Sequence, residues 1–187
     1  MKYTTELLDE IIKNGFETDH VDFKIEFNWH TFNDFKKAKV AKHMAAMANI
    51  PGGGILIFGV ADNRQVKGLS KADLESYDRT RLDQTLEKYL DPIPKYQVVT
   101  VKYGDKQLLI IEVEEFDDIP IITKIDEAKV FRAGGVYVRQ NASSTIIHDA
   151  RAMRRLVNLA VKKQKTELLE SIENILDTGE EQDDWKL

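Results

Sequence analysis

The chain of 187 residues contains no cysteine. This absence excludes disulfide bonds, zinc sites with thiolate ligands, iron–sulfur clusters and a cysteine nucleophile. Long apolar runs are also missing, since no segment approaches the roughly 20 apolar residues of a membrane-spanning helix. Acidic side chains within residues 1–10 stand where a signal peptide requires an apolar core. We therefore expect a cytoplasmic protein without a membrane partner.

Positive charge is not in excess, because the formal net charge is -5 at pH 7. Acidic residues are concentrated in residues 165–187, however, and the rest of the chain is nearly balanced. Overall acidity therefore does not exclude a nucleic-acid partner, and local basic patches must be judged separately. The chain also lacks a phosphate-binding loop of the Walker or Rossmann type, because Gly52, Gly53 and Gly54 precede a strand rather than a helix.

Hydrophobic periodicity predicts an α+β fold, with a mixed, largely antiparallel sheet and flanking helices. Helices are expected over residues 4–14, 33–49 and 70–90, and from about 148 to 177. Strands are expected over residues 21–27, 55–60, 95–103, 107–115 and 136–139, with weaker ones over 119–125 and 129–132. Ser70 is the predicted N-cap of the third helix. We expect one domain, residues 1–164, followed by an acidic helical extension and tail, residues 165–187.

Three carboxylates, Glu17, Asp22 and Asp62, lie near the ends of the first two predicted strands. If these strands pair, the carboxylates converge on a hard divalent cation, and Mg²⁺ or Mn²⁺ is the predicted cofactor. Such an ion activates water for phosphodiester hydrolysis, and Lys24, on the same face as Asp22, would stabilise the charge that develops on the phosphoryl group. In the alternative interpretation Asp22 and Lys24 form the solvated face of an edge strand, Glu17 is a surface residue and Asp62 only builds a turn.

Two basic segments are candidates for contacts with phosphate groups. Lys36 and Lys37 lie near the start of a predicted helix, where cations oppose the helix macrodipole. In the second segment, arginines accompany small polar residues. Its predicted nucleic-acid-binding side chains are Arg139, Asn141, Ser143, Ser144, Arg151, Arg154 and Arg155. Side chains of these types contact nucleic-acid backbones, although a plain solvated face is the favoured explanation of the first segment and a basic, solvated helix surface explains the second equally well.

Several segments together resemble the Schlafen AlbA_2 domain family. The resembling segments are residues 17–24, residues 45–62, which contain Ala-Asn-Ile-Pro-Gly-Gly-Gly, Val66-Lys67-Gly68, Pro120 and residues 136–145, which begin Val-Tyr-Val-Arg-Gln-Asn. They occur in the family's order and span residues from about 15 to 157. An ordered set of this kind is more specific than any one motif.

The resemblance implies a mixed α/β fold, nucleic-acid binding and, as in several Schlafen members, metal-dependent endoribonuclease activity on structured RNA such as tRNA. The family's three acidic positions fall on Glu17, Asp22 and Asp62. Asp22 stands where the family usually has Glu, which shortens the ligand by one methylene group. The chain has neither the zinc site nor the second lobe of the larger Schlafens, and two-fold pairing is one way to recover a groove.

The predicted function is nucleic-acid binding, with metal-dependent cleavage and with RNA favoured over DNA. One alternative is a non-catalytic DNA- or RNA-binding regulator, and another is an adaptor that binds a protein partner through the acidic tail. Val161, Leu168, Ile172 and Ile175 recur at helical intervals, which predicts either a homodimer through the C-terminal helix or a helix folded back on its own domain.

Overall fold

The computed structural model describes residues 3–14, 18–25 and 28–180. The chain divides into two compact units. The first comprises Met1–Phe116 and Pro120–Ile147, and the second comprises Asp117–Ile119 and His148–Leu187. Each unit is described by itself below.

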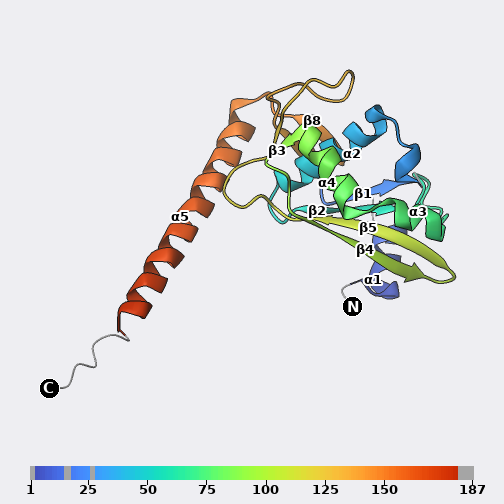
Figure 1. The fold of residues 1–187 in the computed structure, drawn as a ribbon, viewed down its shortest axis with the longest axis horizontal. Coiled ribbons are helices and arrows are strands. Elements are labelled where there is room, and N and C mark those ends of the chain that lie inside the picture. The colour runs from blue at the N-terminus through green and yellow to red at the C-terminus, as the bar shows by residue number, and fades with distance from the viewer. Residues whose placement is uncertain (1–2, 15–17, 26–27, 181–187) are drawn as a thin grey trace. The chain divides into compact units, whose positions relative to one another are not determined.

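The first unit is built on a four-stranded sheet (Figure 1). Its strands are β1 (Val21–Lys24), β2 (Gly54–Phe58), β4 (Tyr96–Tyr103) and β5 (Lys106–Val113), in the order β1-β2-β5-β4. β1 and β2 are parallel, and the other neighbours are antiparallel. The predicted α+β class, the mixed and largely antiparallel sheet and the pairing of the first two strands are therefore confirmed.

Helices cover both faces of this sheet (Figure 1). On one face lie α1 (Thr5–Asp9) and the π-helical turn η1 (Glu10–Asn14), and on the other lie α2 (Asp34–Ala48) and α4 (Arg79–Tyr89). Leu8 and Ile12 pack with Phe23 and Ile57 in one buried cluster, because alternate strand residues point to the α1 face. Asp22 and Lys24 consequently point to the opposite face, beneath α2.

The prediction of a single helix over residues 70–90 is wrong. The chain instead forms α3 (Lys71–Ser76) and then α4, with a break at Tyr77 and Asp78. The ring of Tyr77 packs against Trp29, in the short helix η2 (Trp29–Thr31), and against Phe58, at centroid distances of 5.7 and 4.9 Å. Asp78 starts α4 because its side chain accepts a hydrogen bond from the Arg81 amide. The capping box predicted at Ser70 is confirmed.

Two small sheets complete the first unit. One pairs β3 (Leu90–Asp91) with β6 (Ile122–Thr123), and the other is a hairpin of β7 (Tyr137–Gln140) and β8 (Ser143–Ile146). The strand predicted over residues 129–132 does not form, since that segment contributes only an isolated bridge between Glu127 and Phe131. The buried side chain of Asn49, at the end of α2, donates hydrogen bonds to the carbonyls of Ile121 and Tyr137. It thereby ties β7 to the end of α2.

The second unit contains the helix α5 (Ala150–Glu180). The domain boundary placed at residue 164 from the sequence falls inside this helix. No helix in the described ranges combines the length and the apolarity that a membrane span requires.

Gly52 and Gly53 provide a matched pair for testing the turn that precedes β2. Both have positive φ, at 80° and 65°, but a Cβ on Gly53 would overlap the carbonyl oxygen of Val113, whereas a Cβ on Gly52 would meet open space. We expect Gly52→Ala to lower the free energy of unfolding by about 1 kcal/mol. Gly53→Ala should lower it by about 3 kcal/mol or more, because overlap is added to strain. Urea denaturation of both variants measures the difference, and equal losses would contradict the packing described here.

Candidate functional site

A buried ion cluster forms around Asp22, which is only 3% exposed. β1 supplies Asp22 and Lys24, α2 supplies His43, and β7 supplies Arg139. The ammonium of Lys24 pairs directly with the Asp22 carboxylate. Arg139 Nη1 lies 3.6 Å from Asp22 Oδ1, and His43 Nδ1 lies 3.6 Å from Asp22 Oδ2. The interpretation of Asp22 as part of a solvated strand face is therefore wrong, because α2 and the β7–β8 hairpin cover that face.

Arg139 connects the hairpin to the central sheet. Its side chain is fully buried, and its Nη2 donates to the carbonyls of Thr18 and Val21, at 3.1 and 3.4 Å. Its Nη1 also lies 3.5 Å from the hydroxyl oxygen of Ser144. The sequence placed Arg139 and Ser144 on a nucleic-acid face. That placement is wrong for Arg139, since a buried guanidinium bonded to Asp22 and to β1 cannot contact a phosphate at the surface.

His43 belongs to the cluster, although no spacing in the sequence pointed to it. Its Nδ1 lies 3.2 Å from Arg139 Nη1 and 3.0 Å from Ser144 Oγ. Because a guanidinium has only donors, Nδ1 is the acceptor, and the ring proton belongs on Nε2. Burial lowers the pKa of His43 to about 3, and the nearby cations Lys24, Arg139 and Lys42 act in the same direction, against the opposing effect of Asp22. The imidazole is therefore neutral near pH 7.

The structure describes only two of the three predicted metal ligands, Asp22 and Asp62. Glu17 lies outside the described residues, and Asp62 is exposed in a turn after β2. Asp22 is already neutralised by Lys24 and Arg139, so a divalent cation would meet two positive charges there. Within the described ranges, no group of three or more histidine, aspartate or glutamate side chains is arranged to hold a metal ion. Asp22 and Asp62 by themselves do not fit a Mg²⁺ or Mn²⁺ site.

A basic face, defined as Lys36, Lys37, Lys39 and Lys42, lies along the first three turns of α2. Each ammonium group stands over an aromatic ring: Lys36 over Phe32 at 5.5 Å, Lys37 over Trp29 at 6.0 Å, Lys39 over Phe35 at 4.6 Å and Lys42 over Tyr137 at 5.9 Å from the centroid. Burial lowers the pKa of Lys42, and the charge of Lys39 lowers it further. Within residues 3–14, 18–25 and 28–180, no carboxylate pairs with any of these four lysines.

The β7–β8 hairpin packs against α2 and presents small polar groups at its turn. Asn141 and Ser143 are exposed, whereas Ser144 is half-buried and bonded to His43. Asn141 and Ala142 have φ of 50° and 59°, and the amide of Ala142 donates to the carboxylate of Asp19. Arg151, Arg154 and Arg155 are exposed on α5, in the second unit.

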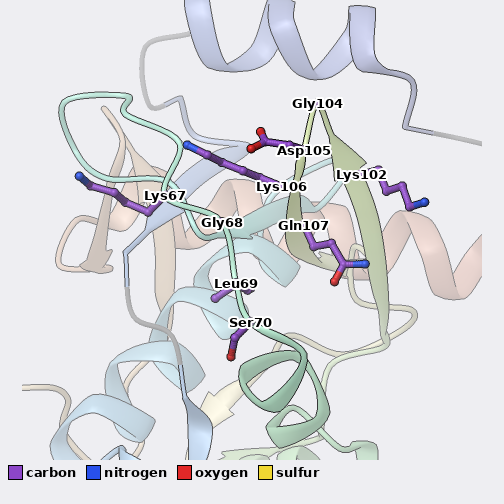
Figure 2. A pocket seen from close by; sticks show the side chains of 9 residues that line it. All are labelled: Lys67, Gly68, Leu69, Ser70, Lys102, Gly104, Asp105, Lys106 and Gln107. Carbon is purple, nitrogen blue, oxygen red and sulfur yellow. The ribbon is translucent and has the colours of Figure 1, made fainter.

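An open pocket of about 560 Å³ lies beside the β4–β5 turn (Figure 2). None of the residues that line it was predicted from the sequence as a site residue. Lys67, Lys102 and Lys106 are among its lining residues. Figure 2 shows the ammonium groups of Lys67 and Lys106 on one side and Lys102 pointing to the other. Lys106 also donates to the carbonyl of Val66, at 2.6 Å. These cations do not converge on one point, so the pocket is not a candidate anion site.

A comparison with known proteins finds the family whose order of segments this sequence resembles. The family model described as Schlafen, AlbA_2 matches residues 17–148. The chain belongs to the Schlafen AlbA_2 family. The match contains the whole Asp22 cluster, the basic face and the β7–β8 hairpin, and it ends before α5.

Individual relatives are distant. An uncharacterized ATP-binding protein of Ureaplasma parvum serovar 3 is 24% identical over 188 aligned positions, which cover 92% of this chain and 52% of that protein. The chain thus spans about half the length of this curated relative. The crystal structure of the DIP2311 protein from Corynebacterium diphtheriae superposes with a TM-score of 0.51 and 24% identity, covering 73% of this chain and 23% of that one. This similarity concerns the fold alone.

A third similar protein is the N-terminal domain of a protein related to the ATP-dependent DNA helicase RecG, from Nitrosomonas europaea. Its solution structure has a TM-score of 0.44 and 22% identity, and the match covers 80% of this chain and 97% of that domain.

The lowered pKa of His43 predicts a pH-dependent stability. In the unfolded chain His43 binds a proton below about pH 6.5, whereas the folded protein leaves it neutral until about pH 3. Falling pH therefore stabilises the unfolded state, by up to roughly 1.4 kcal/mol per pH unit below 6.5. We expect His43→Gln to flatten the loss of stability between about pH 6.5 and pH 4.5, as measured by urea denaturation.

His148→Gln is the matched control, because His148 is exposed and lies outside the cluster. It should leave the pH dependence as in the parent protein. Protonation of the His43 ring at pH 5, observed directly in its NMR chemical shifts, would contradict the neutral acceptor described above.

Proposed function

We propose that the AlbA_2 domain of this chain binds nucleic acid through the basic face of α2. The observation that carries the proposal is that, among the described residues, none of these four lysines is paired with a carboxylate. Asp34, at the start of α2, pairs instead with Lys88 of α4, at 3.1 Å. Phosphate groups would supply the missing negative charge and release condensed counterions.

The surroundings of the basic face suit a flexible polyanion. Lys42 stands over the ring of Tyr137 in β7, so the basic face adjoins the hairpin that exposes Asn141 and Ser143. Lysine charges attract the backbone, and amide and hydroxyl groups add hydrogen bonds to phosphate or sugar oxygens. Such contacts position a strand without reading its sequence. These contacts would allow the domain to bind either RNA or DNA. We propose in addition that it prefers RNA.

The basic face is tested by replacing Lys36, Lys39 and Lys42 together with glutamine. The triple variant should bind a labelled RNA at least about tenfold more weakly, and the slope of log K against log salt should fall by about 2 to 3 units. Fluorescence anisotropy with single-stranded RNA, tRNA and duplex DNA, over a range of salt concentrations, measures both quantities.

The matched control replaces three other exposed lysines, Lys67, Lys71 and Lys102, with glutamine. It removes the same charge from other elements of the first unit. Similar losses in both triple variants would mean that binding follows net charge alone, and an unchanged affinity in the α2 variant would remove the basic face from the proposal.

We further propose that the domain cleaves structured RNA in a metal-dependent reaction. Its support is the family resemblance and the location of Asp62 in the turn that follows β2, whose last residue, Phe58, pairs with Lys24 at the end of β1. If Glu17, Asp22 and Asp62 hold a metal, Mn²⁺ should produce RNA fragments that a chelator abolishes. Asp62→Ala should then remove cleavage and leave the affinity within about twofold, because Asp62 contributes no positive charge.

The assay uses tRNA, single-stranded RNA and DNA with Mg²⁺, Mn²⁺ or chelator, resolved on denaturing gels. Asp105→Ala, in the exposed β4–β5 turn, is the matched control. Cleavage that persists in Asp62→Ala would assign the activity to another site or to a contaminant. Binding without metal-dependent products would leave a non-catalytic nucleic-acid-binding domain.

A further inference from the structure

Helix α5 exposes large apolar side chains along much of its length. The exposed apolar residues Met153, Val157, Val161, Leu168, Leu169, Ile172, Ile175 and Leu176 are 38, 49, 43, 61, 60, 44, 69 and 64% exposed. Their spacing places them on one side of the helix, in a stripe with steps of three, four and seven residues. A contiguous stripe of this kind on a soluble protein marks a surface that another element covers.

Charge is segregated along the same helix. The half from residue 151 to 165 contains Arg151, Arg154, Arg155, Lys162, Lys163 and Lys165 and no acidic residue. The following residues reverse the sign, with Glu167, Glu170 and Glu173. The first turn of α5 has no acid and its last turn has no base. This order opposes the helix macrodipole, so the charges do not stabilise α5 as an isolated helix.

We propose that α5 is a self-association element that pairs antiparallel with α5 of a second copy of this chain. In the antiparallel arrangement the basic half of each helix lies against the acidic half of the other, and the apolar stripes face each other along the seam. A parallel pair would place basic against basic and acidic against acidic, and like charges across an interface are costly. Charge complementarity thus favours a second α5 as the partner that covers the apolar stripe, and it favours the antiparallel orientation of that partner.

The pairing has a defined geometry. A two-fold axis crosses the seam near Gln164, where the sign of the charge changes, and the interface is the same patch on both copies. Two helices packed in this way lie about 8–10 Å apart. A helix of 31 residues is roughly 45 Å long, so the two Ala150 ends lie at opposite ends of the pair.

Sedimentation equilibrium of the full chain tests the association. The parent protein should be a dimer, and reversal of Glu167, Glu170 and Glu173 to lysine should raise the dissociation constant at least about tenfold, because the helix becomes basic throughout. The matched control reverses three exposed acids of the first unit, Glu87, Asp105 and Glu114, and should remain dimeric. A parent protein that stays monomeric at every concentration would overturn the proposal.

The absence of cysteine makes the direction testable by disulfide crosslinking. In the antiparallel pair, Gln164→Cys lies near the two-fold axis and should crosslink under mild oxidation. Ile175→Cys lies 11 residues, or about three helical turns, beyond Gln164, so it is far from its symmetry mate and should not crosslink. Sedimentation under reducing conditions verifies that both variants remain dimeric. Equal crosslinking at both positions would indicate a parallel pair and would overturn the proposed orientation.

Discussion

The guanidinium of Arg139 and the carboxylate of Asp22 lie together inside the first unit, and much of its arrangement depends on them. Removal of two charges from water costs several kcal/mol, which is offset only where the remaining polar atoms also find partners. Arg139 meets this condition in part, because its Nη2 donates to the carbonyls of Thr18 and Val21, whereas its Nε is buried without a hydrogen-bond partner among the described residues. Those bonds tie the β7–β8 hairpin to β1 across the face that α2 covers. Asn49 adds a second polar tie, from the end of α2 to β7, so the hairpin, the helix and the sheet form one body.

The same buried cluster sets the electrostatics of the surface above it. Asp22 is matched by Arg139 and Lys24, so its negative charge does not reach the solvent. His43 stays neutral because of burial, and burial together with the charge of Lys39 lowers the pKa of Lys42. The Asp22 carboxylate thus balances the charge of a buried arginine. What remains at the surface is a row of ammonium groups, which suits phosphate recognition better than metal binding.

Local pattern was sufficient to predict the four strands of the central sheet, because alternation over Val21–Lys24 and the apolar run after Gly54 are properties of short segments. It also placed Asp22 and Lys24 on one face. It could not tell which face is buried, since Arg139 lies more than a hundred residues from Asp22 in the chain and the covering elements are fixed by tertiary packing. His43 was missed because a buried neutral histidine leaves no spacing pattern. The break at Tyr77 was missed because an aromatic cluster, rather than a glycine or proline, ends α3.

Two helices in this chain carry charges that oppose their own macrodipoles. In α2, Lys36 and Lys37 lie in the first turns, and in α5 the basic half comes first. Each such charge costs a few tenths of a kcal/mol or more near a helix end, so neither arrangement strengthens the helix that bears it. α2 is stabilised by its buried C-terminal half, from Met44 to Ala48, and this leaves its lysines available to a polyanion. In α5, by contrast, residues 164–176 are all exposed. The inverted copy of α5 proposed above would match its apolar stripe and both of its charged halves.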